Sequence, residues 1–520
     1  MMDVDQLIKF IQKQFEWQAP VKSLWQTLAD NFYPERADFT VTRNAGDEIA
    51  DQLLSSYPVM MRRDLCNSFS SMLRDGDWFN ITVDGEADHA GKTWLEWASR
   101  RQKKFMYHPS ANFVRATREG DHDYGTFGSL VMSVEPNRRY DGILFRTWHQ
   151  RDCCWWEDEN GMVCGVARQW KPMLMQVEAF FGRKAMHPKM IEQLDGENGQ
   201  LKEADIYHIQ IPTEQYGNEK GAERRYALIF VDVANKHIIE EVFVDRKHYA
   251  VPRFQTIAGH PYAYSPAAIT ALPDSRMLQA MTHTLMEAGE RYARPPLVSP
   301  GGRVLQGDVD LGPDGITYYD SEYDERLGQV LRPMTQDRGG FPIGLELRDS
   351  IVDVLASAWY INKITLPEPN RDMTAYEVQE RMKQYRRENL PLFSPIEAEY
   401  NGQICEMAFD LGMQMNMFGS VEDIPESLRE RDVVFKFESP LTESEEERKM
   451  QHFHQTADML AKVAEVDPGL SQNVNFDEAF RDAITGMGAP EKWLFPVEQV
   501  QEGRKVMAEQ MAAQQETAAA

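Results

Sequence analysis

The sequence predicts an α+β fold that is mainly helical, and three patterns support this prediction. Apolar residues recur at helical spacing through much of the first 80 residues. Between about 143 and 255 the pattern changes to short apolar runs separated by turn residues, which is typical of antiparallel sheet. Farther on, two long amphipathic stretches bracket a segment rich in Gly, Pro and Asp, which predicts a helical hairpin with a structure at its tip.

Length and composition exclude several classes of protein. The chain has 520 residues, of which 42% are hydrophobic, so it can build a large core spread over three or four domains at about 150 residues each. Its formal net charge of −26 argues against tight, sequence-specific DNA binding, which usually needs a basic surface. Aromatic residues make up 11% of the chain, and this excludes disorder along its whole length.

Cysteine usage and hydropathy indicate the compartment. The five cysteines are Cys66, Cys153, Cys154, Cys164 and Cys405. They form no CxxC pair, which favours reduced thiols over a disulfide framework. The first residues carry acid where a signal peptide needs base, and no run of about 18 apolar residues occurs. We therefore expect synthesis in a cytoplasm and no membrane span.

The first 135 residues are expected to be helical with two short strands. The expected elements are a helix from Leu7 to about Leu28, a helix over 53–73, a strand over 78–83, helices over 94–106 and 112–123, and a strand over 128–134. Asp75-Gly76-Asp77 is a breaker that ends the second helix. The helix over 94–106 ends in a basic patch made by Arg100, Arg101, Lys103 and Lys104.

The region 143–255 is expected to contain two β-hairpins. Strands over 143–156 and 162–170 flank Asn160-Gly161, a strong hairpin signal. Strands over 227–233 and 237–244 flank a short turn at Ala234-Asn235-Lys236. Residues 171–203, between the hairpins, are expected to form a small helical insert.

The helical hairpin is the most informative part of the sequence. Its first helix opens at Pro273-Asp274-Ser275, where Asp or Ser can serve as N-cap, and runs for about 30 Å to Ala293. Its second helix covers 344–362. The residues expected to pack are Met277, Leu278, Met281, Leu285, Leu347, Ile351, Val354, Leu355 and Ala358. A hairpin cannot bury such stripes alone, whereas identical neighbours can, and a heterologous contact that closes makes a ring. We expect Leu355→Asp to prevent ring closure while the body that precedes the hairpin stays folded.

The C-terminal part is expected to be helical around one strand. After a break at 366–370, a helix starts at Thr374, is kinked at Pro391 and Pro395, and resumes over 397–417. A strand is expected over 433–437 and a helix with an acidic first turn over 443–466. The Ala- and Gln-rich end, 505–520, predicts a fraying helix or a loose tail.

Two sequence patterns imitate chemical sites. A strand leads into Gly85-Glu86-Ala87-Asp88-His89-Ala90-Gly91-Lys92-Thr93, but a phosphate loop has four residues between its glycines and here there are five. His149, Cys153, Cys154 and Cys164 fit no zinc spacing, and small core hydrophobes are the better interpretation. We therefore expect no metal, no cofactor and no enzymatic activity.

Seven segments of the chain, taken in order, resemble the portal, or head-to-tail connector, proteins of short-tailed bacteriophages. The segments are 31–39, 64–79, 112–128, 262–274, 295–298, Met373-Thr374-Ala375-Tyr376-Glu377-Val378 with Arg381, and 439–441. Each segment is a weak signal alone, but seven in order are specific and cover nearly the whole chain. Tyr262 and Tyr264 depart from the basic or glycine residues that the family often has there, and the run Glu443–Glu447 is more acidic than expected.

The resemblance implies a portal-type fold that assembles into a ring, with a wing, a helical-hairpin stem, a clip and a helical crown. Its implied division is 1–255 for the wing, 256–293 for the first stem helix and its lead-in, 294–343 for the clip, 344–362 for the second stem helix, 363–373 for the tunnel loop, 374–438 for the long wing helix and return strand, and 439–520 for the crown and tail. It also implies a homo-oligomer of twelve subunits at one capsid vertex of the virion, assembled in the host cytoplasm.

The implied function is a channel for double-stranded DNA during packaging and ejection. The implied partners are the DNA, terminase, scaffolding and major capsid proteins, and tail adaptor proteins, with no membrane. An acidic wall would repel the DNA backbone and let it slide, although salt screens this repulsion beyond about 8–10 Å. The residues expected to guide DNA are Asn370, Arg371 and Lys363 around the tunnel loop and Arg303 in the clip. Two alternatives stay open: an ATPase of the packaging motor, based on Lys92, and a capsid or scaffold protein.

Overall fold

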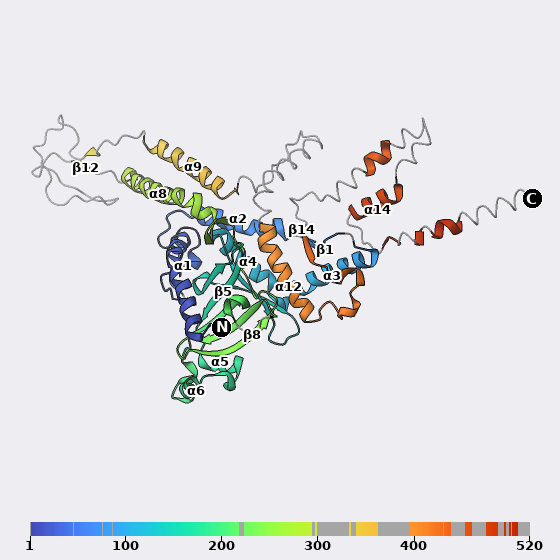
Figure 1. Cartoon of the computed structure of the whole chain (residues 1–520). Helices are drawn as coiled ribbons and strands as arrows, with labels where there is room; N and C mark the ends of the chain where they lie inside the picture. The colour runs from blue at the N-terminus through green and yellow to red at the C-terminus, as the bar shows by residue number, and fades with distance from the viewer. Residues whose placement is uncertain are drawn as a thin grey trace, which may run out of the picture.

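The computed structural model shows a body of helices and sheets from which two long helices extend side by side (Figure 1). It describes residues 2–293, 297–298, 332–333, 340–361, 396–437, 453–459, 475–486, 493–495, 499–500 and 502–507, except 45, 75, 86, 218–222 and 430. The chain is α+β and mainly helical, as the sequence predicts.

The helices among the described residues are α1 (Val4–Phe32), α2 (Tyr57–Leu73), α3 (His89–Met106), α4 (Phe113–Phe127), α5 (Leu174–Phe181), α6 (Pro188–Asp195), α7 (Thr213–Tyr216), α8 (Leu272–Ala293), α9 (Gly340–Ala358), α12 (Gly402–Gln414) and α14 (Phe476–Gly486). The strands are β1 (Phe79–Val83), β2 (Val131–Pro136), β3 (Ile143–Trp148), β4 (Cys153–Glu157), β5 (Val163–Trp170), β6 (Ile206–Pro212), β7 (Tyr226–Asp232), β8 (His237–Val244), β9 (Tyr249–Ala250), β10 (Gln255–Ile257), β11 (His260–Tyr264), β12 (Leu297–Val298), β13 (Arg332–Pro333) and β14 (Val433–Phe437).

The first helix, α1, joins two hydrophobic cores. It starts at a capping box in which Asp3 and Gln6 satisfy each other's backbone N–H groups. Its N-terminal half, through Leu7 and Ile11, packs against the apolar face of the five-stranded sheet. Its C-terminal half, through Trp25, belongs to the main core together with α2, α4 and α12. One long amphipathic helix therefore fixes the sheet relative to the helical layer.

The five-stranded sheet is an antiparallel meander in the order β4-β5-β6-β7-β8. Both predicted hairpins are present, with Gly161 at φ +74° and Lys236 at φ +54° in their turns. The α5–α6 insert lies between β5 and β6, where the sequence predicts it. The strand predicted over 143–156 is wrong in one respect, because it is two strands: β3 pairs with β2 and β4 belongs to the larger sheet. The break falls at a short turn that the side chain of His149 caps.

Two strands that are far apart in the sequence, one near its start and one near its end, pair with each other. β1 and β14 run antiparallel, with Phe79 opposite Phe437 and Val83 opposite Val433. The sequence predicts both strands but not their pairing. The helix predicted over 397–417 begins as a π-helical turn, Glu397–Asn401, and continues as α12. The helix predicted from Thr374 and most of the one predicted over 443–466 lie outside the described residues.

A buried ion pair ties α2 to α4 and to the turn before α12. Arg74, the C-cap of α2, donates two hydrogen bonds to the carboxylate of Asp121 at 2.8 and 2.9 Å. It donates a third to Asn401 Oδ1 at 3.0 Å, and its guanidinium lies 4.5 Å from the centre of the Tyr400 ring. Burial raises the pKa of Asp121, and the attraction of Arg74 opposes this rise. Three segments distant in sequence therefore depend on one guanidinium.

We expect Arg74→Ala to lower the free energy of unfolding by about 3–5 kcal/mol, because it leaves the Asp121 carboxylate buried without a partner. The matched control is Arg100→Ala, which removes an exposed pair with Glu96 and should cost below about 1 kcal/mol. Urea denaturation followed by tryptophan fluorescence measures both. Equal losses in the two variants would contradict this account of the buried pair.

Candidate assembly surface on the helical hairpin

Helices α8 and α9 form an antiparallel hairpin that projects from the body (Figure 1). The sequence predicts these helices over 274–293 and 344–362, and the structure places them at Leu272–Ala293 and Gly340–Ala358. Between them along the chain, β12 and β13 pair antiparallel, with Leu297 opposite Pro333. Helix α9 ends early because Tyr360 adopts a left-handed backbone with φ +57°.

The root of the hairpin is buried in the main core. Leu278 of α8 and Leu355 and Trp359 at the end of α9 are fully buried. The Trp359 ring meets Phe32, the last residue of α1, edge to face with the ring centres 5.1 Å apart. Full burial of a leucine contributes about 1.5–3 kcal/mol, so these side chains anchor the hairpin to its own subunit.

A single glutamine also fixes the root to a loop of the body. The side-chain oxygen of Gln279 accepts hydrogen bonds from the backbone N–H groups of Leu54 and Ser55, both at 2.9 Å. Its amide nitrogen donates to the Ser55 carbonyl at 2.9 Å. An amide side chain can both accept from and donate to the backbone of a loop in this way, which sets the rotation of α8 about its axis.

Farther out, the two helices approach each other closely at a glycine. A Cβ atom added to Gly344 would lie 2.9 Å from Cδ2 of Leu285, which is nearer than carbon atoms pack. Leu285 therefore fills the space over Gly344, and α8 and α9 are in direct contact at this level of the hairpin.

A stripe of exposed apolar residues runs along α9 on a different face from the buried one. Ile343, Leu347 and Val354 expose 63%, 52% and 51% of their surface. Positions i, i+4 and i+11 fall within about 40° of one another around a helix. Met277 and Met286 of α8 are exposed as well. Large apolar residues in a row on a helix mark an interaction surface.

A third face of α9 is acidic. Glu346, Asp349 and Asp353 follow one another at helical spacing, and all three are exposed. Arg348 donates hydrogen bonds to Asp349 at 2.6 and 3.0 Å. The helix therefore presents a face held by its own subunit, an exposed apolar stripe and an exposed acidic row.

The nine residues that the sequence predicts to pack divide into three groups. Leu278, Ile351 and Leu355 are buried inside one subunit. Met281, Leu285 and Ala358 are half-buried, and Met277, Leu347 and Val354 are exposed. Ile343 and Met286 are also exposed on the hairpin and are not among the predicted residues, although Ile343 stands four residues before Leu347 on the same stripe. Asn370, Arg371, Lys363 and Arg303 lie outside the described residues.

The segment that imitates a phosphate loop is a capped helix start. The Asp88 carboxylate accepts hydrogen bonds from the Gly91 backbone N–H at 2.9 Å and from the Ser427 hydroxyl at 2.5 Å, and the bond from Ser427 is the larger cause of its lowered pKa. It occupies the N-terminus of α3, where a nucleotide phosphate would have to bind. Lys92 is exposed on the outer side of the helix.

The cysteines and His149 are not gathered into a metal site. Cys153 lies in the main core and its neighbour Cys154 in the core beside the five-stranded sheet, because adjacent residues in a strand point to opposite faces. Burial raises the pKa of the Cys153 thiol to about 12. His149 contacts Asp38 at 2.5 Å. Among the described residues, no three potential ligands lie together.

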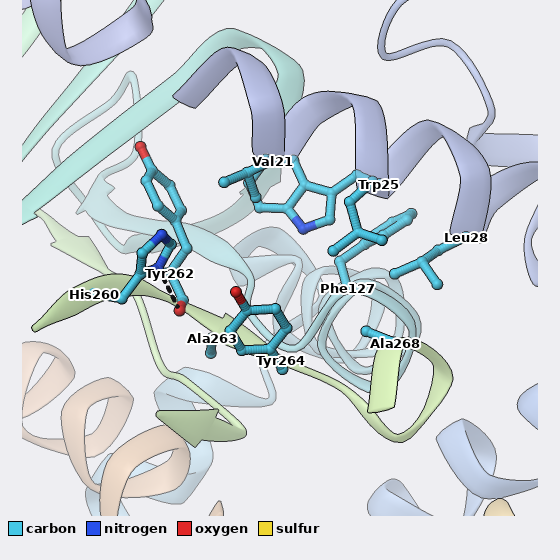
Figure 2. Close-up of a pocket in the computed structure, with 10 residues that line it drawn as sticks. Val21, Trp25, Leu28, Phe127, His260, Tyr262, Ala263, Tyr264 and Ala268 are labelled. Atoms are coloured by element: carbon cyan, nitrogen blue, oxygen red, sulfur yellow. Dashed lines mark hydrogen bonds between the residues drawn. The ribbon is translucent and has the colours of Figure 1, made fainter. Parts of the chain in front are cut away.

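Figure 2 shows a small apolar cavity where β11 leads toward α8. Trp25 and Leu28 of α1 and Phe127 of α4 line it together with Tyr262 and Tyr264. Its volume of about 20 Å³ is too small for an organic ligand, and its lining is mainly apolar. The aromatic residues that depart from the family pattern thus contribute to packing beneath α1.

Within the described ranges, no helix combines the length and hydropathy of a membrane span.

The burial of the hairpin root changes the outcome expected for Leu355→Asp. Because Leu355 is fully buried in its own subunit, an aspartate there should lower the free energy of unfolding by more than about 4 kcal/mol, in addition to any effect on ring closure. The neighbouring variant Val354→Asp should change stability by less than about 1 kcal/mol, since this side chain is half exposed. Thermal unfolding of both proteins checks the difference, and equal destabilisation would contradict the assignment of faces.

Comparison with known proteins identifies the family. The family described as "Bacteriophage head to tail connecting protein" matches residues 4–494. No individual curated protein matches the chain. The matched range includes the body and the hairpin, and it agrees with the resemblance carried by the seven segments. The chain belongs to the family of bacteriophage head-to-tail connecting proteins, a structural family whose members are parts of the phage virion.

Proposed function

We propose that the chain is the subunit of a closed ring at one capsid vertex of a short-tailed phage, and that double-stranded DNA passes through the ring during packaging and ejection. The observation that carries this proposal is the exposed apolar stripe Ile343, Leu347 and Val354 on a hairpin that is anchored in the body by a different face. Membership of the connector family supports it.

The position of the stripe favours a ring over a two-fold dimer. On α9 the stripe and the buried face are about 100° apart around the axis, so a neighbour that covers the stripe approaches from the side. A side-by-side contact between unlike faces, repeated by rotation, closes into a ring around an open centre. The twelve-fold symmetry follows from the resemblance to portal proteins and stays a proposal.

The charge of the chain suits a conduit that does not grip its cargo. A net charge of −26 and the acidic row Glu346, Asp349 and Asp353 disfavour tight binding of the phosphate backbone. We propose that Arg303, Lys363, Asn370 and Arg371 supply isolated guiding contacts. The protein needs no cofactor and catalyses no reaction in this proposal.

The remaining assignments extend the proposal to the parts of the particle. Residues 1–255 with 374–438 would form the wing, 256–293 and 344–362 the stem, 294–343 the clip, 363–373 the tunnel loop and 439–520 the crown. The clip would meet the terminase and later the tail adaptor proteins. Scaffolding and major capsid proteins would surround the wing while the head assembles in the host cytoplasm.

The ring proposal predicts that Leu347→Glu with Val354→Glu abolishes large assemblies, because it places two charges where apolar contact is needed. The matched control, Met175→Glu with Leu201→Glu, changes two exposed apolar residues of the α5–α6 insert and should leave assembly intact. Mass photometry and negative-stain imaging measure both. Unchanged rings in the hairpin variant would remove the stripe from the interface, and shells or filaments in the wild type would favour a capsid or scaffold protein.

The motor alternative makes a different prediction. If the protein is a conduit, titration of ATP with magnesium should give no binding at micromolar concentrations, because Asp88 occupies the helix start that a phosphate would need. Isothermal titration calorimetry of the wild type and Lys92→Ala measures this. Micromolar affinity that the substitution removes would favour an ATPase of the packaging motor.

A further inference from the structure

One face of α3 points outward, and the packing of its other face fixes this orientation. The inward face is formed by Leu95, Ala98, Ser99, Gln102 and Met106. The Ser99 hydroxyl accepts a hydrogen bond from the Ile81 backbone N–H at 2.8 Å, and the Gln102 side chain donates to the Cys405 carbonyl at 2.8 Å. These bonds to β1 and α12 leave the helix no freedom to turn.

The outward face is basic in a chain that is strongly acidic overall. It and its flanks carry Lys92, Arg100, Arg101, Lys103 and Lys104, and the one acidic residue of the helix is Glu96. The chain as a whole has a net charge of −26, so the concentration of positive charge on this helix is a local reversal.

Part of this positive charge has no carboxylate partner. Lys103 pairs with Asp77 at 3.0 Å and Arg100 with Glu96 at 3.1 Å. Arg101 donates instead to the neutral carbonyl of Met417 at 3.1 Å. Among the described residues, no carboxylate lies within ion-pair distance of Arg101, Lys92 or Lys104.

A second element near the C-terminal end of α3 also carries exposed positive charge. The turn 137–142 between β2 and β3 lies against the chain that follows α3, since a Cβ on Gly142 would be 3.8 Å from Oγ of Ser110. Arg138 and Arg139 are exposed in this turn. We define the α3 basic surface as Arg100, Arg101, Lys104, Arg138 and Arg139.

We propose that the α3 basic surface binds the phosphate backbone of duplex DNA without sequence preference. The inference rests on the proposed function, which brings DNA to this protein. Helix α3 lies on the side of the body away from α8 and α9 (Figure 1), so the contact is separate from the hairpin. Duplex DNA carries one negative charge per about 1.7 Å of its axis. Exposed, long cationic side chains on two elements can neutralise these phosphates without a precisely shaped binding site, and such contacts do not read the base sequence.

The binding experiment uses the intact assembled protein and a fluorescently labelled, covalently closed circular duplex. A closed circle cannot thread through a ring, so its binding reports on surfaces outside the bore. The test variant is Arg100→Glu with Lys104→Glu. The matched control, Lys184→Glu with Lys189→Glu, makes the same change of charge at exposed positions in and before α6, at the other end of the body (Figure 1).

We expect the test variant to bind the circle at least tenfold more weakly at about 50 mM salt. The plot of log affinity against log salt should also become less steep, with the magnitude of its negative slope smaller by about 2. The control should stay within twofold of the wild type. Arg138→Glu with Arg139→Glu provides a second test variant, with the same expected loss, if the first fails to fold.

Three results would overturn the inference: no binding of the circle by the wild type, equal affinities for test and control variants, or tighter binding of a polyglutamate peptide than of the duplex. The last would indicate an acidic protein partner. Mass photometry on the same samples separates this inference from the proposed function, because intact rings with unaltered DNA binding would contradict the α3 surface alone, whereas the absence of rings would contradict the conduit.

Discussion

The structure depends on one constraint: within the described residues, the body buries one face of the α8–α9 hairpin and leaves the stripe Ile343, Leu347 and Val354 exposed. Leu278, Leu355 and Trp359 are buried in the main core, where the Trp359 ring meets Phe32 of α1, and Gln279 fixes the rotation of α8 through the 54–55 loop. With the rotation set, the stripe through Leu347 has to face away from its own subunit. The exposed stripe gives the proposed assembly from identical copies a physical basis, because an apolar row on a projecting helix favours contact with another surface.

Charge is divided between parts of the molecule in a way that fits this arrangement. The acidic row of α9 lies on the projecting hairpin, and the basic residues of α3 lie on the side of the body away from it. DNA that moves past the acidic row of α9 would meet weak contacts, which allow sliding. DNA that binds the basic residues of α3 would meet stronger contacts, which hold it in place. The net charge of −26 alone does not reveal this division.

The sequence located most elements but not their partners. Helical periodicity placed α8 and α9 within a few residues, and turn residues placed both hairpins of the large sheet. The pairing of β1 with β14 was not predictable, because the two strands are more than 300 residues apart and the residues of one strand do not identify its partner or register. Val354 and Leu355 show the same limit: neighbouring apolar residues look alike in a periodic pattern, and only the position of the body decides which is covered.

Electron cryo-microscopy of the purified, assembled protein would show whether the exposed stripe of α9 is the contact between neighbouring copies. We expect a closed ring with an open centre in which Ile343, Leu347 and Val354 of each subunit contact the hairpin of the next. A particle in which these side chains stay in solvent, or a subunit that covers them itself, would contradict it.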